Sequence, residues 1–338
     1  MNINRIVFLL GSVLFVSCFN QSDITNKTIV KTNATTCRVA FYNTENLFDT
    51  EDDIHVNDND FLPTGKLKWT TERYALKLQH IRAVLDGLNE TRSLAFIGFS
   101  EVENADVLKD LLTDTTYQFI HYNSSDPRGI DVCLVFNPRF FTPIISYLSD
   151  FDKVDDPELF SREVLVVKGV LWNDTVHVLV NHWPSRRAGE EASAHKRIAA
   201  AMLTQEIVDS IYMKNPLSNI IVMGDFNDQP SDESMSVMLN TASKKDKSVG
   251  LANPFKAIQD AGNGTCRYKR DWFLFDQILI SNSMMNKKGA EFIEAQIYNP
   301  EWLYYKEDSN SGPFRTFLGN KYYGGYSDHF PVYIDLKK

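Results

Sequence analysis

The sequence repeatedly places a carboxylate, an amide or a histidine where a run of apolar residues stops. In NIIVMGDFND (219–228), for example, a strand-like aliphatic run ends at Asp225 and Asn227. Apolar runs bounded by Gly and Asx residues are typical of buried strands that end at a turn. The same event recurs at Asn43 with Glu45, Glu101, Asp131, His182, Asp276, and Asp328 with His329. One such event is typical of an ordinary turn, but seven together indicate a polar site built at strand ends.

These residue types favour metal-assisted phosphoester chemistry over the common alternatives. Hard oxygen ligands with few sulfurs suit magnesium or calcium rather than zinc. Two aspartate–histidine couples supply proton transfer beside a metal-bound phosphate. The sequence contains no H-E-x-x-H set, no G-x-S-x-G elbow, no P-loop and no G-x-G-x-x-G fingerprint after a strand.

The elements that must position these residues alternate along the chain. Helical apolar spacing behind Thr70 predicts a helix over 70–89, and 189–214 is predicted as the longest helix. Short helices are expected at 105–112 and 232–239. Strands are predicted over 37–43, 93–104, 117–123, 130–137, 142–148, 161–172, 174–184, 219–225 and 275–281, with a hairpin tip at Asn173–Asp174. Residues 324–336 are predicted as a turn followed by a final strand. Residues 240–270 carry a looser pattern.

Interleaved strands and helices, with several neighbours needing only hairpins, predict a mixed α/β fold of two packed mixed β-sheets flanked by helices. No repeat and no low-complexity linker divides residues 37–336. We therefore expect residues 37–338 to form a single catalytic domain, which is long enough to bury a full core.

The N-terminus has the features of an export signal. MNINR provides a short positive region, and the apolar run of residues 6–16 is too short to span a bilayer. Cys18 stands where bacterial lipoprotein signals place the lipidated cysteine, although Phe15 occupies a position where leucine is usual. We therefore predict a signal peptide over 1–17, a flexible tether over 18–36, and an exported lipoprotein anchored at Cys18 and facing the periplasm or cell surface. Ordinary cleavage and secretion is the alternative.

Composition and cysteine count limit the remaining function classes. The net charge is −9, and about −10 without residues 1–17, which argues against a broad basic face that wraps nucleic acid. It leaves room for an enzyme that holds a polyanion locally through metal ions and a few arginines. Cys37, Cys133 and Cys266 have no C-x-x-C spacing, so a structural zinc site is not expected and at most one disulfide can form.

Taken in order, FYNTEN, SEVEN, RGID, NHWPSR, GDFND, FDQILIS and YSDHFP resemble the endonuclease/exonuclease/phosphatase superfamily. The resemblance runs from Asn43 to Pro331, and NHWPSR with FDQILIS further resembles secreted bacterial nuclease-like members. Each motif alone is weak, but their shared order is specific. The resemblance implies a four-layer α/β sandwich with a divalent-metal site at one edge, holding Mg²⁺, with Mn²⁺ or Ca²⁺ as alternatives.

Carried over residue by residue, the resemblance implies roles for ten positions. Glu101 would be the principal metal ligand, with Asn43, Glu45 and Asp328 near the same ion. Asp225 and Asn227 would activate the attacking water and hold a phosphoryl oxygen. Asp276 would orient His329 at the scissile phosphate, and Asp131 would pair with His182 as in the deoxyribonuclease branch.

Three further residues are predicted to contact substrate. Arg162 resembles a phosphate-contacting arginine of the deoxyribonuclease branch, and a surface ion pair with Glu163 or Glu158 is the alternative. Ser185 and Arg186 follow His182 and could bind a substrate phosphate, since a planar guanidinium suits that geometry.

The leading hypothesis is an exported magnesium-dependent phosphodiesterase that hydrolyses nucleic acid, most simply DNA, with no protein partner implied and with membrane contact only through the lipid anchor. The alternative is a phosphatase or phospholipase-type enzyme acting on a sphingomyelin-like lipid or on a sugar or inositol phosphate. A binding protein that kept the fold and lost the reaction is disfavoured, because all seven positions hold chemically competent residues.

Overall fold

The computed structural model describes residues 32–149, 162–239, 249–285, 289–305 and 311–338. The predicted export signal and most of the tether lie outside the described residues. Residues Lys31–Lys338 form one compact unit. Within the described residues, no helix is both long enough and apolar enough to cross a bilayer.

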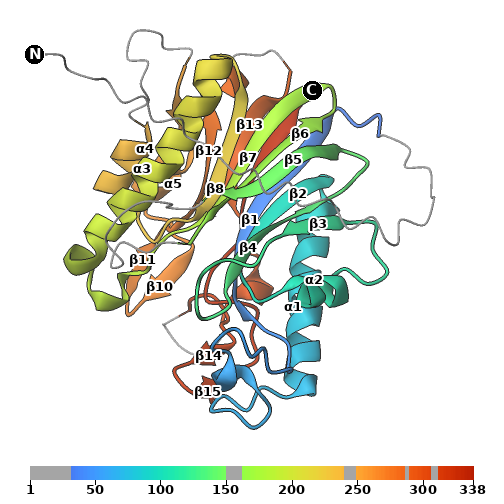
Figure 1. The fold of residues 1–338 in the computed structure, drawn as a ribbon, viewed down its shortest axis with the longest axis vertical. Helices are drawn as coiled ribbons and strands as arrows, with labels where there is room; N and C mark the ends of the chain where they lie inside the picture. The colour runs from blue at the N-terminus through green and yellow to red at the C-terminus, as the bar shows by residue number, and fades with distance from the viewer. Residues whose placement is uncertain (1–31, 150–161, 240–248, 286–288, 306–310) are drawn as a thin grey trace, which may run out of the picture. The chain divides into compact units, whose positions relative to one another are not determined.

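Two six-stranded mixed sheets form the centre of the fold (Figure 1). The first, sheet A, has the order β13-β16-β1-β2-β4-β3, and the second, sheet B, has the order β5-β6-β7-β8-β12-β9. Only β1–β2 and β7–β8 are parallel among the paired strands. The strands are β1 Thr36–Leu47, β2 Leu94–Val102, β3 Gln118–His121, β4 Asp131–Phe136, β5 Phe141–Ser149, β6 Val164–Leu171, β7 Asp174–His182, β8 Asn219–Asp225, β9 Leu251–Ala252, β12 Asp276–Ser281, β13 Glu291–Ile297 and β16 Val332–Lys337.

Helices cover the outer faces of both sheets, which gives four layers. Figure 1 shows α1 and α2 on the side of sheet A, and α3 and α4 on the side of sheet B, whereas α5 contributes Phe255 to the cluster between the sheets. Their bounds are α1 Thr71–Glu90, α2 Ala105–Leu111, α3 Glu190–Lys214, α4 Glu233–Leu239 and α5 Phe255–Asp260. Two small ribbons are formed by β10 Cys266–Tyr268 with β11 Asp271–Phe273 and by β14 Phe317–Leu318 with β15 Lys321–Tyr322. The described residues also include 3₁₀ turns at Asn59–Phe61, Arg186–Ala188, Asn282–Met285 and Glu301–Leu303.

Three buried clusters correspond to the three interfaces between the layers. The inner cluster joins the two sheets through residues such as Val39, Val180 and Met223. The second packs sheet A against α1 and α2, and the third packs sheet B against α3 and α4. Each fully buried aliphatic side chain contributes about 1.5–3 kcal/mol relative to exposure. The predicted two-sheet sandwich flanked by helices is therefore confirmed.

Local expectations were met with small shifts. The helix predicted at 70–89 spans 71–90, and the longest helix begins at Glu190. The hairpin tip was predicted at Asn173–Asp174, but Leu171 pairs with Asp174, so Trp172 and Asn173 form the tip. Strand β13 was missed, and the looser region after Asn240 holds β9, β10 and α5. Cys37, Cys133 and Cys266 are free and buried.

Candidate active site

The residues predicted at strand ends converge because they continue the buried inner faces of the two sheets. Val176, Val178 and Val180 of β7 belong to the inner cluster. Side chains alternate along a strand, so His182 falls on the same inner face. The same alternation places Asp225 after Met223 in β8 and Asn43 after Phe41 in β1. Because every second side chain of a strand points to the same face, these side chains lie between the two sheets at one edge.

Strand register then sets three of these residues side by side. His182 pairs with Asp225 across the parallel β7–β8 ladder, and Asp225 pairs with Asp276 across the antiparallel β8–β12 ladder. Residues directly opposite one another on neighbouring strands have Cβ atoms about 4.5–5.5 Å apart. In sheet A, Asn43 pairs with Ser100, the residue before Glu101. The site is thus a direct consequence of how the strands pair.

Irregular backbone supplies the remaining side chains. Glu45, Glu101 and Asn227 have φ values of 51°, 63° and 50°, in the left-handed region. The β1–β2 ladder shifts register between Asn43 and Leu47, and the β2–β4 ladder shifts between Ser100 and Val102. Bulges of this kind re-aim side chains, and a left-handed non-glycine residue costs about 1–3 kcal/mol. Strained backbone of this kind is found mostly at functional sites, where the surrounding structure keeps the residue in its unfavourable conformation.

The centre of the site is a polar group formed by Asn43, Glu101, His182 and Asp225. The amide Nδ2 of Asn43 donates to Asp225 Oδ2 at 2.9 Å and to Glu101 Oε1 at 3.4 Å. His182 Nε2 lies 3.7 Å from both of these carboxylate oxygens. Sheets A and B each contribute two of the four residues, so the group exists only when the two sheets are packed.

Beside this group lies an aspartate–histidine couple. His329 Nδ1 lies 2.6 Å from Asp276 Oδ2, and Asp276 is fully buried. Burial opposes a charge on the imidazole, but Asp276 and Asp225 raise the pKa of His329 well above its usual value. Asp328, about one-third exposed, places Oδ1 3.9 Å from His329 Nε2.

The surroundings of His182 and His329 shift the pKa values of these two histidines in opposite directions. Burial, with the nearby charges of Arg162, Arg128 and His329, lowers the pKa of His182 well below its usual value. Burial raises the pKa of Asp225 to about 7, and Asp276 adds to the rise while His329 opposes it. Environments that separate the pKa values of neighbouring groups are the means by which active sites assign acid and base roles.

The donor set fits a hard divalent cation. Ligand atoms of Asp225, Asp276 and His329 all lie within 4.8 Å of one another. Asp276 Oδ1 and His182 Nδ1 are buried without a hydrogen-bond partner in the structure. Glu101 adds a partly exposed carboxylate, whose Oε2 accepts from the backbone amide of Asn46 at 2.9 Å. The carboxylate oxygens of Glu101, Asp225 and Asp276 suit magnesium, manganese or calcium, and a protonated His329 would lie beside the ion without binding it.

Asp131 does not pair with His182, so this part of the prediction is wrong. Its Oδ2 lies 2.9 Å from His121 Nε2, and its Oδ1 accepts from the amide of Ser124 at 3.0 Å. His121 ends β3 and pairs in register with Cys133 of β4, which brings its ring to the carboxylate at the start of β4. The neighbours of His182 are instead Glu101 and Asp225.

Glu45 lies apart from the central group. Its two oxygens accept the amides of Thr316 and Phe317, which anchors the loop before β14. The buried ammonium of Lys77 donates to Thr316 Oγ1 and to the carbonyl of Tyr326, both at 2.6 Å. Burial and Asp328 raise the pKa of Glu45, while Lys77 opposes the rise. Because both oxygens of Glu45 hold backbone amides, the structure gives Glu45 a positioning role, and its place near a metal stays a prediction.

Two of the three predicted substrate contacts are engaged inside the protein. Arg162 is buried, ion-paired with Asp126 at 3.0 Å, and donates to the carbonyl of His182 at 2.6 Å. It therefore braces the end of β7. Of the two alternative partners, Glu163 accepts the backbone amide of Ser125 at 3.0 Å, and Glu158 lies outside the described residues. Arg186 donates to the carbonyl of Asn227 and to Asp228, both at 2.7 Å, and holds the loop after β8. Ser185 is exposed.

Asn227 lies between these supports. Its backbone amide donates to Asp225 Oδ1 at 2.9 Å, and its Nδ2 donates to the carbonyl of Trp183 at 3.0 Å.

Sequence reasoning missed three residues near the site: His121, Lys77 and Arg128. Arg128 is half-exposed, pairs with Asp126 at 2.8 Å, and its charge reaches Glu101. The RGID motif contains it, and an exposed arginine two residues from a buried strand is the only signal that could have singled it out.

Comparison with known proteins agrees with this geometry. The model of the Endonuclease/Exonuclease/phosphatase family matches residues 38–338, so the chain belongs to this family. Its members are hydrolases of phosphoester bonds and generally use divalent metal ions. No curated protein matches the chain.

Three solved structures illustrate the shared fold. The D. rerio TDP2 complexed with a single-strand DNA product is 12% identical, with a TM-score of 0.56, and the match covers 90% of this chain and 100% of that one. The Bacteroides thetaiotaomicron mannosyl-6-phosphatase Bt3783 is 15% identical, with a TM-score of 0.55 and coverage of 89% and 100%. The human Nocturnin catalytic domain with bound sulfate is 17% identical, with a TM-score of 0.55 and coverage of 90% and 93%.

Proposed function

We propose that the protein is an exported, magnesium-dependent phosphodiesterase that hydrolyses nucleic acid, with DNA as the leading substrate. The observation that carries this proposal is the alignment of His182, Asp225 and Asp276 across three neighbouring strands. His329 and Glu101 complete the group from other segments. Two imidazoles therefore flank carboxylates at a single strand edge, as hydrolysis of a resistant phosphodiester requires.

The surroundings of each residue indicate the role that it has in hydrolysis. His329, charged and held by Asp276, donates a hydrogen bond to a phosphoryl oxygen and stabilises the charge that develops there. Asp225, fixed by Asn43 and by the amide of Asn227, orients the attacking water and accepts its proton. When bound, a divalent cation supplies Lewis-acid stabilisation of the phosphoryl oxygens. Burial keeps His182 neutral, so its ring can form hydrogen bonds without adding a positive charge beside a bound cation.

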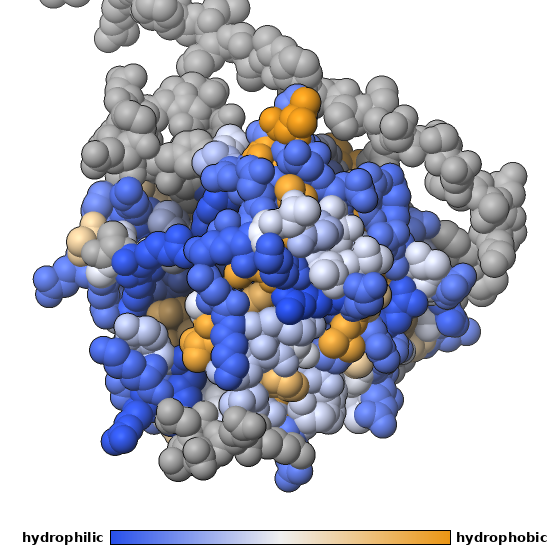
Figure 2. All heavy atoms as spheres, turned by 90° about the horizontal axis from the view of Figure 1, so that it is seen from below, coloured by the Kyte–Doolittle hydropathy of each residue, from blue (hydrophilic) through white to orange (hydrophobic). Residues whose placement is uncertain are grey.

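The end of the molecule that carries the site suits a hydrophilic substrate. Figure 2 views this end and shows a largely hydrophilic surface over which apolar side chains are scattered. In the β14–β15 ribbon, Phe317 and Tyr322 pack against Trp69. An enzyme that enters a lipid bilayer needs apolar side chains directed outward, so this arrangement favours nucleic acid over a sphingomyelin-like lipid.

A second candidate is hydrolysis of a small sugar or inositol phosphate. Arg162 and Arg186 are both engaged by internal groups, and Arg128 is a half-exposed arginine whose charge reaches Glu101. A polyanionic strand normally contacts several cations, because phosphate binding releases counterions. A small phosphoester needs fewer, and a sugar phosphatase shares this fold.

A substrate panel with magnesium separates the candidates. Plasmid DNA, single-stranded DNA, RNA, bis-p-nitrophenyl phosphate, mannose 6-phosphate, inositol phosphates and sphingomyelin would be compared at equal enzyme concentration. Preferential cleavage of DNA supports the leading proposal, and preferential release of phosphate from a monoester supports the second. Turnover that survives both chelation and His329→Ala contradicts the assigned site.

Export and anchoring belong to this proposal as well. An N-terminal run typical of a signal peptide, followed by Cys18 and a polar tether, supports a lipoprotein that faces the periplasm or cell surface. Metabolic labelling with a fatty-acid analogue tests it, because Cys18→Ser should abolish the label and release the protein from membranes. Labelling of the Cys18→Ser variant at the original level would contradict the anchor.

A further inference from the structure

A second polar pocket lies on the outer face of sheet B, between β5, β6, β7 and the last turn of α3. Its volume is about 610 Å³, within the 300–1,000 Å³ typical of ligand pockets. Six of its lining residues matter here: Ile145, Tyr147, Lys168, His177, Lys214 and Leu217. We call it the lysine pocket.

Positive charge gathers in the lysine pocket without a matching carboxylate. None of its lining residues is aspartate or glutamate. The charges of Lys168 and Lys214, added to burial, lower the pKa of His177 to about 4, which shows that both ammonium groups act on this ring. Among the described residues, neither lysine has an ion-pair partner in the structure. An anion bound in the pocket would be attracted by both ammonium groups.

The walls of the lysine pocket are apolar and exposed. Ile145, Tyr147 and Leu217 are 55%, 44% and 63% exposed, although each lines the pocket. Ile144, next to Ile145, and Met213, next to Lys214, are also exposed. Exposed apolar side chains collected around fixed charges are characteristic of a ligand or interaction site. The pocket therefore offers two kinds of contact, ammonium groups and aliphatic or aromatic surface.

The lysine pocket is separate from the active site. It includes Thr175 and Asn219 at the beginnings of β7 and β8, whereas His182 and Asp225 end the same strands. Seven residues of strand span about 20–25 Å. In addition, His177 is an odd number of residues from His182, so their side chains point to opposite faces of sheet B. One small ligand cannot occupy both sites.

We propose that the lysine pocket binds an anionic head, phosphate or carboxylate, that is attached to an apolar body. Lys168 and Lys214 hold the head, and the neutral ring of His177 offers a hydrogen bond. Ile145, Tyr147 and Leu217 cover the apolar body. The site is a binding site distinct from the hydrolytic one, and no bond is broken in it.

The test uses methyl NMR of the purified protein, because the Ile145 and Leu217 methyl groups report this pocket alone. Octyl phosphate, inorganic phosphate and 1-octanol are titrated separately. We expect octyl phosphate to shift both residues saturably at a concentration at least about tenfold lower than inorganic phosphate, with no saturable shift from octanol. Lys168→Gln and Lys214→Gln should each weaken octyl phosphate binding about fivefold or more, and the double variant should abolish it.

Matched variants keep the outcome interpretable. Lys109→Gln, at an exposed lysine of α2, should leave binding unchanged, and His329→Ala should too, which separates this pocket from the hydrolytic site. Sedimentation with phosphatidylglycerol vesicles, against phosphatidylcholine vesicles, identifies the source: binding lost in the double variant assigns a lipid head, and octyl phosphate binding without vesicle binding assigns a soluble ligand. The proposal is overturned if Ile145 does not shift, if the double variant binds as the native protein does, or if octanol equals octyl phosphate.

Discussion

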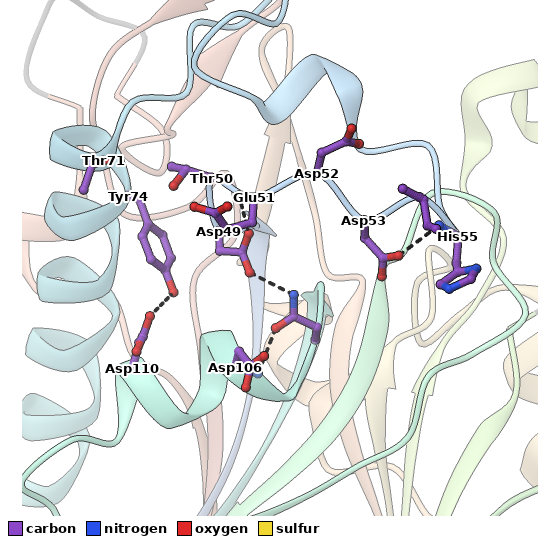
Figure 3. Close-up of a pocket in the computed structure, with 12 residues that line it drawn as sticks. Asp49, Thr50, Glu51, Asp52, Asp53, His55, Thr71, Tyr74, Asp106 and Asp110 are labelled. Carbon is purple, nitrogen blue, oxygen red and sulfur yellow. Dashed lines mark hydrogen bonds between the residues drawn. The ribbon is translucent and has the colours of Figure 1, made fainter.

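Two regions of the molecule are rich in carboxylates, and they differ in how those carboxylates are held. The first is the active site, built from the ends of β1, β2, β7, β8 and β12 and from His329. The second, the acidic pocket, has a volume of about 600 Å³ and is lined by Asp49, Glu51, Asp52, Asp53, Asp106 and Asp110 (Figure 3). By composition alone, the acidic pocket is the more attractive cation site.

In the acidic pocket Asp49, Asp53 and Asp110 are satisfied by nearby groups. Asp49 Oδ1 accepts the amide of Glu51, and Asp53 Oδ1 accepts the amide of His55, two residues away in each case. Asp110 accepts from the hydroxyl of Tyr74 at 2.9 Å (Figure 3). Such Asx turns stabilise a loop and leave little reason for a bound ion. In the active site, by contrast, Asp225 and Asp276 are buried and are brought together by sheet register. Carboxylates that are forced together, rather than merely numerous, mark the reactive site.

The largest expected difference between the two regions is the effect of substituting their ionisable residues on the rate of hydrolysis. Asp225→Asn and His329→Gln should each reduce phosphoester hydrolysis by a factor of about 10²–10⁴, because each removes a group aligned with the reacting phosphate. Asp52→Asn and Asp106→Asn in the acidic pocket should leave the rate within about twofold. Steady-state kinetics on bis-p-nitrophenyl phosphate measures both. Equal losses from the two regions would show that the contrast is wrong.

Metal binding gives the next largest effect. Magnesium or manganese should raise the melting temperature of the native protein, because an ion that binds only the folded state stabilises it. Asp276→Asn should lose most of that rise, while Asp53→Asn should keep it. Differential scanning calorimetry with and without a chelator provides the measurement. If Asp53→Asn lost the rise and Asp276→Asn kept it, the acidic pocket would be the cation site.

Lys77 tests whether buried charge supports the site. Lys77→Met removes the buried charge that opposes the raised pKa of Glu45, together with two hydrogen bonds to Thr316 and Tyr326. Removing one partner from a buried charge interaction costs about 3–5 kcal/mol. The double variant Lys77→Met with Glu45→Gln should recover part of the free energy of unfolding, measured in urea. Asp110→Asn, which removes one hydrogen bond at the acidic pocket, should cost only about 1 kcal/mol. A Lys77→Met variant as stable as the native protein would contradict this role.

The smallest expected effect is a pH dependence of stability that arises at His177 in the lysine pocket, whose lining contains no carboxylate. The pKa of His177 is about 4 in the folded state, below the ordinary 6.5, so between these values the unfolded chain binds more protons. The free energy of unfolding should therefore fall as the pH drops from about 6.5 to about 4, by less than about 1 kcal/mol since the ring is only partly buried. His177→Asn should flatten this part of the stability–pH curve. An unchanged slope in that variant would rule out His177 as its origin.

Much of this architecture could be predicted from the sequence, because strand alternation and polar strand ends are local signals. Asn43, His182, Asp225 and Asp276 follow from continuing an alternating inner face by one more step. The partner of Asp131 could not be predicted, since it depends on the β3–β4 register that brings His121 alongside. Glu45 could not be placed either, because its left-handed backbone turns the side chain toward Thr316 and Phe317. Strand β13 was missed because its partly exposed residues carry a weak pattern.

The position of β16 has a consequence for when the protein becomes active. This strand, three residues after His329, lies inside sheet A between β13 and β1 rather than at its edge. A nascent chain that has not yet emerged from the ribosome as far as Lys337 cannot close the sheet that carries Asn43 and Glu101. The group of Asn43, Glu101, His182 and Asp225 therefore cannot assemble fully until the last segment of the chain has been synthesised.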